Sequence, residues 1–212
     1  MTDATDPSLQ RAIDAIVPAG VLVGHRVIRP GDEDALLADE AASIASRVVA
    51  VRRASGAARI VARGLLAQCG IRDVPLRKAA SGEPVWPAGI TGSLAHDDAV
   101  AVAAVGWRRD VESVGVDIEP AVPLPAETLE LIATPRERRN IADDPLSGRL
   151  LFAVKEAVYK AAFPLDRLFL EFRDIEVDIA QRNATTRNGR VFAVRYCVAS
   201  HLLALAVSGL KT

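Results

Sequence analysis

The sequence predicts an α+β fold built from two similar lobes. Both halves of the 212 residues contain segments with helical apolar periodicity and short apolar runs typical of strands. A stretch with Pro120, Pro123 and Pro125 breaks the chain near its middle. We therefore expect an N-terminal lobe over residues 1–113 and a C-terminal lobe over 114–212, although the sequence shows no repeat.

In the first half the apolar pattern predicts a strand over 21–28 and, after the N-cap Asp32, a short helix over 33–39. A long helix follows over about 41–68 and ends near Gly70, a typical C-terminal cap. Prolines and glycines between 75 and 89 predict an ordered loop that carries Trp86. Apolar runs then predict strands over 100–105 and 111–119.

In the second half Thr134 and Glu137 have capping-box spacing, and Pro135 stands at the first helical position, so a helix begins there. A further helix is predicted over about 146–162. Alternating apolar residues predict strands over 174–179, 191–199 and 202–207.

Composition excludes several classes of protein. With 26 basic and 27 acidic residues, the chain lacks the charge excess of a nucleic-acid binder. Cys69 and Cys197 lack metal-ligand spacing, so we expect reduced, buried thiols and a cytoplasmic location. The first residues do not resemble a secretory signal, and no apolar run reaches the roughly 20 residues that span a bilayer.

Three carboxylates suggest a cation site. Asp117 and Glu119 leave the same face of the predicted strand, roughly 7 Å apart. If the helix that carries Glu156 packs beside this strand, the three side chains complete an oxygen-lined site suited to Mg²⁺. Acids at this spacing are also common on exposed strands, and Glu156 with Lys160 has the spacing of an ordinary surface ion pair.

Basic residues provide candidate phosphate ligands. Arg52, Arg59 and Arg63 fall within about 20° of one line along a helix, which forms either a phosphate-binding stripe or a solvated basic face. Ser93 and His96 lie at an expected turn where they can donate to an anion, although a lone histidine in a turn is usually just exposed.

Five segments, at 58–63, 78–89, 92–96, 114–120 and 152–161, resemble in order those of the Sfp-type 4′-phosphopantetheinyl transferases. The similarity is to the branch that contains enterobactin synthetase component D and mycobacterial siderophore and lipid-pathway enzymes, and it covers roughly 47–171. It implies a pseudo-twofold monomer. Each lobe would have a small, mostly antiparallel sheet packed on a long helix, with coenzyme A in the cleft between the lobes.

The resemblance also implies roles for individual residues. Phosphates of coenzyme A, chiefly the 3′-phosphate, would be held by Arg52, Arg59, Lys78 and His96, to which we add Arg63 and Ser93. Asp117, Glu119 and Glu156 would hold Mg²⁺, for which Mn²⁺ can substitute. Lys155 and Lys160 would bind and neutralise phosphoryl groups as catalytic residues, and Glu156 is the candidate to accept a proton.

Two departures from the family pattern matter. The helix that carries Arg52, Arg59 and Arg63 starts with a sequence that differs from the family pattern, which leaves open whether Arg52 or Arg53 binds phosphate. Asp97 and Asp98 follow the histidine and should weaken coenzyme A binding unless they turn outward.

The function implied is transfer of 4′-phosphopantetheine from coenzyme A to a serine of an apo acyl or peptidyl carrier protein, with release of 3′,5′-ADP. Such a reaction would serve siderophore, nonribosomal peptide or polyketide synthesis. Residues 163–170, with Arg136, Arg138 and Arg139, are a candidate docking surface; the alternative is that both phenylalanines in this segment belong to the core. The alternatives are a Mg²⁺-dependent nucleotide or pyrophosphate hydrolase and a non-catalytic coenzyme A-binding regulatory module.

Overall fold

The computed structural model describes residues 4–141 and 143–211. Within these residues the helices are α1 (Pro7–Asp14), η1 (Asp32–Ala35), α2 (Ala38–Ser43), α3 (Val49–Gln68), α4 (Ala126–Ile132), α5 (Pro135–Asn140), α6 (Ser147–Asp166) and η2 (Phe172–Asp174). The strands are β1 (Val21–Val27), β2 (Ile90–His96), β3 (Val100–Trp107), β4 (Ser113–Pro120), β5 (Ile175–Asp178), β6 (Asn183–Thr186), β7 (Val191–Val198) and β8 (His201–Ser208).

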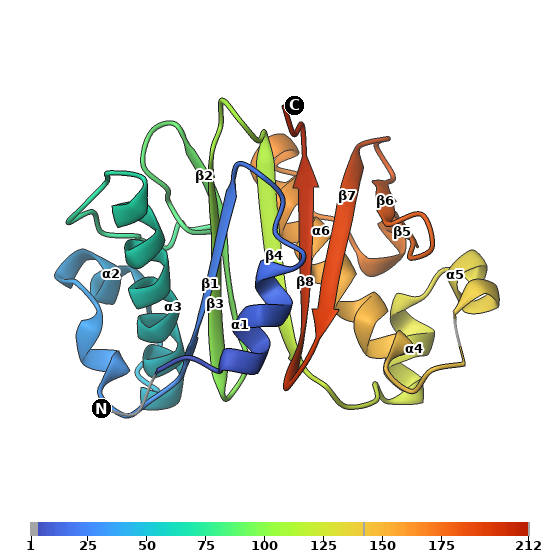
Figure 1. Ribbon diagram of the computed structural model, residues 1–212, viewed down its shortest axis with the longest axis horizontal. Helices are drawn as coiled ribbons and strands as arrows, with labels where there is room; N and C mark the ends of the chain where they lie inside the picture. Colours follow the sequence, from blue (N-terminus) through green and yellow to red (C-terminus); the bar gives the residue numbers. More distant parts are fainter. Residues whose placement is uncertain (1–3, 142, 212) are drawn as a thin grey trace.

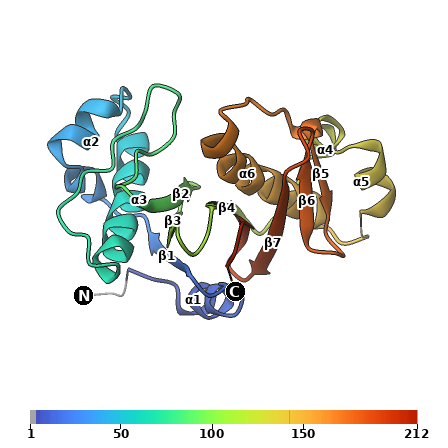
Figure 2. The ribbon, with the colours of Figure 1, turned by 90° about the horizontal axis from the view of Figure 1, so that it is seen from above.

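Each half of the chain packs a long helix on an antiparallel sheet. The first half has a three-stranded sheet in the order β1-β3-β2, covered by α3. The second half has a five-stranded sheet in the order β4-β8-β7-β6-β5, with α6 packed against β4 and β8. Figures 1 and 2 show both long helices on the same side of the sheets. The predicted α+β fold with two similar lobes is confirmed, and the predicted boundary at 113/114 stays a prediction.

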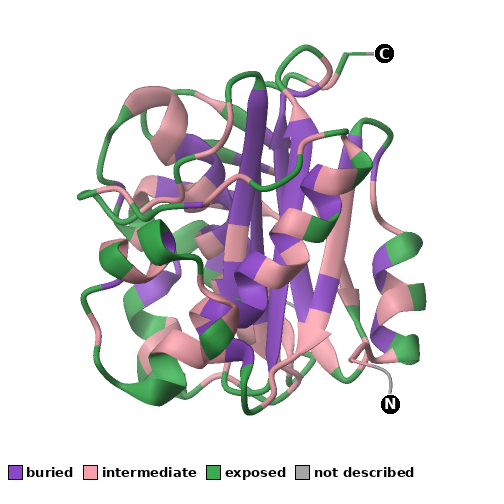
Figure 3. Cartoon of the chain, turned by 90° about the vertical axis from the view of Figure 1, so that its left-hand side faces the viewer, coloured by how far each residue is buried: buried purple, intermediate pink, exposed green. Residues whose placement is uncertain are grey.

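The two sheets share a core. Strand β4 packs beside β2 and β3, and one cluster of buried side chains draws Val102 from the first sheet and Val116 and Leu205 from the second. Helix α1 adds Leu9 and Ile13 to this cluster from the side opposite α3 and α6 (Figure 2). Figure 3 shows the central strands as the most buried part of the molecule.

A glycine sets the distance between β4 and α6. A Cβ on Gly115 would lie 2.0 Å from the carbonyl oxygen of Ala157, so only glycine permits this approach. The close contact brings Asp117, two residues along β4, to the helix face that carries Glu156 and Lys160. The local sequence thereby positions the side chains discussed below.

The predicted helix over 41–68 is two helices, because α2 ends at Ser43 and α3 begins at Val49. The cause is Glu40, whose buried carboxylate accepts hydrogen bonds from Arg63 and from the backbone N–H of Leu76. These bonds fold α2 back against α3, so the chain must turn between them.

Other predictions were met or missed for identifiable reasons. The capping box of α5 is present, with Thr134 and Glu137 each accepting from the backbone N–H of the other. The segment with Ser93 and His96 is not a turn, because it forms strand β2, paired along its length with β3.

Cys69 and Cys197 are unpaired and half-buried. No helix among the described residues combines the length and hydropathy needed to cross a bilayer.

Candidate active site

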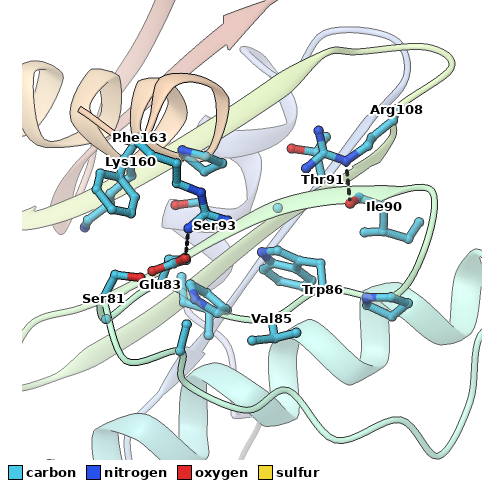
Figure 4. A pocket seen from close by; sticks show the side chains of 18 of the residues that line it. Ser81, Glu83, Val85, Trp86, Ile90, Thr91, Ser93, Arg108, Lys160 and Phe163 are labelled. Atoms are coloured by element: carbon cyan, nitrogen blue, oxygen red, sulfur yellow. Dashed lines mark hydrogen bonds and ion pairs between the residues drawn. The ribbon is translucent and has the colours of Figure 1, made fainter. Parts of the chain in front are cut away.

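A cleft of about 640 Å³ separates the two halves of the molecule. One wall is β2 with the loop before it, which contribute Glu83, Trp86 and Ser93. The opposite wall is the second half of α6, with Glu156 and Lys160. Figure 4 shows side chains from both walls converging on this space. The cleft is therefore built from segments that are far apart in the sequence.

Asp117 and Lys160 form an ion pair beside this cleft. Lys160 Nζ lies 2.6 Å from Asp117 Oδ1. The other oxygen, Asp117 Oδ2, is buried and has no hydrogen-bond partner. Burial raises the pKa of Asp117 above its ordinary value although Lys160 opposes the rise. The pair therefore leaves one buried carboxylate oxygen available to a further cation.

The other two carboxylates are held near Asp117 by different elements. Glu119 Oε2 accepts a hydrogen bond of 2.8 Å from Arg149. Burial, and then the charge of Asp117, raise the pKa of Glu119. Burial also raises the pKa of Glu156, with Asp117 adding to the rise and Lys160 opposing it. Three carboxyl groups thus lie where β4 meets α6, and two of them are paired with basic side chains.

The three carboxylates do not form a ready-made metal site. Within residues 4–141 and 143–211, no three acidic, histidine or cysteine side chains are grouped closely enough to hold an ion. Asp117 is paired with Lys160, and Glu119 is paired with Arg149. The expected convergence of Asp117, Glu119 and Glu156 therefore requires rotation of side chains.

Two family models match the chain. The 4′-phosphopantetheinyl transferase N-terminal domain matches residues 39–106, and the 4′-phosphopantetheinyl transferase superfamily matches residues 113–207. The 4′-phosphopantetheinyl transferase Npt of Nocardia iowensis is 38% identical over 182 residues, which cover 84% of this chain and 82% of the relative. The chain belongs to the Sfp-type 4′-phosphopantetheinyl transferase family, and it is an enzyme.

Further relatives agree with this membership. The 4′-phosphopantetheinyl transferase PptT of Mycobacterium tuberculosis is 40% identical over 161 residues, covering 73% of this chain and 69% of the relative. Enterobactin synthase component D of Escherichia coli (strain K12) is 33% identical over 150 residues, covering 66% and 68%. The similarity spans both walls of the cleft in this phosphopantetheinyl transferase.

Lys155 does not face the cleft, contrary to the expectation from the sequence. Its buried ammonium lies 2.7 Å from Glu137 Oε2 and donates to the backbone carbonyls of Ile132, Phe172 and Ile175. Neighbouring residues on a helix point about 100° apart, so Lys155 faces the core when Glu156 faces the cleft. We therefore assign Lys155 no contact with phosphate in this transferase.

Two arginines of the predicted stripe are also engaged elsewhere. Arg59 is buried and donates to the carbonyl oxygens of Leu76 and Ser55. Arg63 pairs with Glu40 at 2.7 Å. These bonds hold α2 and the segment before the cleft loop against α3, so Arg59 and Arg63 have structural partners in place of phosphate.

Arg52 and the adjacent Arg53 differ in whether they form an ion pair. Arg53 pairs with Glu33 at 2.8 Å. Arg52 is half-buried on the first turn of α3 and makes no ion pair with any residue that the structure describes. Lys78 is exposed at the start of the cleft loop. Of the two adjacent arginines, Arg52 is therefore the better candidate phosphate ligand.

His96 ends strand β2 close to the charged pair. Although His96 is exposed at the strand end, partial desolvation and the charge of Lys160 lower its pKa below the ordinary value, while a hydrogen bond with the backbone of Asp97 and the charge of Asp97 oppose this. Asp97 itself turns away: Oδ1 accepts from the N–H groups of Ala99 and Val100, and Oδ2 lies 3.0 Å from His201 Nε2. Its charge is therefore directed to the strand end and not toward the cleft.

A second groove of about 540 Å³ lies on the other side of Glu156 and Tyr159. It is lined by Leu131, Phe169 and Phe172, and the first two are each 71% exposed. Glu156 thus stands between the interlobe cleft and an open apolar groove. The sequence did not predict this arrangement, because Leu131 on α4 and Phe169 in the loop after α6 are brought together only by tertiary packing.

Proposed function

We propose that this enzyme transfers 4′-phosphopantetheine from coenzyme A to a serine of a carrier protein and releases 3′,5′-ADP. The observation that supports this best is the pairing of Lys160 with Asp117 beside the interlobe cleft, with Glu156 on the same helix face. Family membership names the reaction class, and the cleft supplies the charged groups that it needs.

In the proposed reaction the serine Oγ attacks the β-phosphorus of coenzyme A. A new bond forms between Oγ and phosphorus while the bond to the bridging pyrophosphate oxygen breaks, and that oxygen leaves with 3′,5′-ADP. Such transfers depend mainly on positioning and on stabilising negative charge. Lys160 would contact the pyrophosphate oxygens, and Arg52, Lys78 and His96 would hold the remaining phosphate, with Ser93 as a further donor in the cleft wall.

Asp117, Glu119 and Glu156 have the chemistry to hold Mg²⁺. All three offer hard oxygen donors, their pKa values are raised by burial, and Asp117 Oδ2 has no partner. A bound Mg²⁺ would neutralise charge that develops on the pyrophosphate. Glu156 would take the serine proton, directly or through water.

The apolar groove beside Glu156 is our candidate for carrier docking. Phe169 lies within the segment proposed from the sequence, and Leu131 extends the same surface. Arg173 lines the groove and donates to the carbonyl of Glu130, to which Arg138 also donates. Exposed apolar side chains with a basic edge suit an acidic carrier helix. A monomeric, cytoplasmic protein stays a prediction.

The function is tested by incubating the protein with coenzyme A, Mg²⁺ and an apo carrier protein, and then weighing the carrier. Transfer predicts a phosphopantetheine-sized gain in mass that disappears with a chelator. Release of 3′,5′-ADP without a carrier and without mass gain would indicate a hydrolase instead. Binding of coenzyme A without either product would indicate a regulatory module.

A further inference from the structure

Glu83 and Arg167 connect the two lobes across the cleft. Glu83 lies on a loop fixed by two backbone hydrogen bonds, from Ala79 N–H to the Glu83 carbonyl and from Val85 N–H to the Arg77 carbonyl. Its Oε1 accepts a hydrogen bond from Arg167 Nη1, at the C-terminal end of α6. Both residues line the cleft, and Figure 4 shows Glu83 directed toward the α6 wall.

Only one of the two carboxylate oxygens of Glu83 has a hydrogen-bond partner. Oε2 is buried and has no hydrogen-bond partner, although Oε1 is paired. Burial alone would raise the pKa of Glu83, but Ser81 and Arg167 outweigh it and hold this pKa below its ordinary value. A buried, ionised oxygen without a donor is unfavourable, so such atoms normally mark a ligand or water position.

The surroundings of Oε2 suit a flat, nitrogen-bearing group. The rings of Trp86 and Phe163 line the same cleft. The guanidinium of Arg167 lies 5.6 Å from the centre of the Phe163 ring, which fixes the arginine that in turn orients Glu83. The side chain of Glu83 is 16% exposed and that of Arg167 is 61% exposed, so the acceptor faces the protein interior while its partner faces water.

We infer that Glu83 is a specificity-determining residue that accepts a hydrogen bond from an N–H donor of coenzyme A, and that Arg167 is its positioning residue. This inference rests on the proposed function. Coenzyme A offers two sources of such a donor, the amino group of adenine and the amides of the pantetheine arm. A carbonyl group at the same point has no hydrogen to donate and would leave this ionised acceptor without a partner.

The test measures dissociation constants by calorimetry, with Mg²⁺ present, for coenzyme A, 3′,5′-ADP and a coenzyme A analogue whose base is hypoxanthine. In Glu83→Gln the amide oxygen is expected to face Arg167 and its NH₂ to face the ligand, so coenzyme A should bind about tenfold more weakly or worse. Arg167→Gln keeps the carboxylate and should have a smaller effect. Glu127→Gln, on the exposed surface of α4 outside the cleft, is the control and should change nothing.

The three ligands distinguish the two donors. If the adenine amine is the donor, Glu83→Gln weakens 3′,5′-ADP and coenzyme A by the same factor, and the hypoxanthine analogue binds weakly to wild type and is insensitive to the substitution. If a pantetheine amide is the donor, only coenzyme A and the analogue are weakened.

Unchanged binding of all three ligands to Glu83→Gln would overturn the inference. An equal loss in Arg167→Gln and Glu83→Gln would also overturn it, because the ion pair alone would then explain the effect. In both cases wild type would still transfer phosphopantetheine to a carrier. If the proposed function is wrong, wild type itself shows no transfer.

Discussion

Lys160 Nζ lies 2.6 Å from Asp117 Oδ1, which joins the C-terminal half of α6 to strand β4 beside the interlobe cleft. This ion pair places a cation next to a carboxylate that has one buried oxygen without a partner. Lys160 is therefore a candidate to bind the pyrophosphate, and Asp117 is a candidate to bind its Mg²⁺.

Lys160→Ala should lower kcat/KM for phosphopantetheine transfer by about 100-fold or more, because it removes a charge aimed at the developing negative charge. The measurement is a steady-state assay with coenzyme A and an apo carrier. Lys211→Ala removes an exposed lysine near the end of the chain and serves as the control. Equal activities of the two variants would exclude Lys160 from the reaction.

Lys155→Met should destabilise the fold by about 3–5 kcal/mol, because it leaves the buried carboxylate of Glu137 without its cation. Chemical denaturation measures this loss. Adding Glu137→Gln should recover part of the stability, since the uncompensated charge is then gone. A stable Lys155→Met protein that has lost only transfer activity would instead restore the catalytic role expected from the sequence.

Gly115→Ala should destabilise the protein by about 2 kcal/mol or more, because the added Cβ would meet the Ala157 carbonyl at 2.0 Å. Gly64→Ala is the matched control: Gly64 lies on the exposed side of α3 with nothing within 4 Å, and should gain about 0.5–1 kcal/mol. Thermal unfolding compares the two. Similar effects of the two substitutions would refute the close approach of β4 and α6.

Glu156→Gln should abolish transfer and yet raise thermal stability at neutral pH. Burial raises the pKa of Glu156 above its ordinary 4.5, so its favourable contribution to the fold is present below 4.5 and is lost as pH rises through the folded-state pKa. The advantage of the variant over wild type should therefore grow as pH rises from about 4.5 through the folded-state pKa of Glu156.

The measurement for Glu156 is the unfolding temperature of both proteins across this pH range without Mg²⁺. Glu127→Gln, on the exposed surface of α4, is the control and should show no such trend. A variant that loses stability at neutral pH would indicate that Glu156 makes a favourable structural contact as a carboxylate.

Phe169→Ala should raise KM for the carrier protein about tenfold while leaving the dissociation constant of coenzyme A unchanged, because Phe169 is 71% exposed beside Glu156. Val191→Ala, which removes a residue that is 60% exposed on β7, is the control. Loss of coenzyme A affinity in Phe169→Ala would assign the groove to the cofactor in place of the carrier.

The sequence predicted those features that depend on local spacing. Asp117 and Glu119 on one strand, Glu156 and Lys160 on one helix, and the capping box at Thr134 all follow from periodicities of two or of 3.6 residues. The ordered resemblance to a family then indicated which of these segments meet.

Contacts between residues far apart in the sequence could not be predicted from local spacing. The sequence predicted that Lys155 and Arg63 bind phosphate. Instead Lys155 pairs with Glu137, 18 residues away, and Arg63 pairs with Glu40, 23 residues away. Glu83 and Arg167 are 84 residues apart, and nothing in their local sequence marks them as partners. Helix periodicity gives the direction of a side chain but not what will be packed there.

The most direct test of the central claim is the mass of an apo carrier protein after incubation with coenzyme A, Mg²⁺ and either wild type or Asp117→Asn. We predict a phosphopantetheine-sized gain with wild type and none with Asp117→Asn, whose folding is checked by its unfolding temperature. No gain with wild type across several carriers, or an undiminished gain with folded Asp117→Asn, would contradict the account.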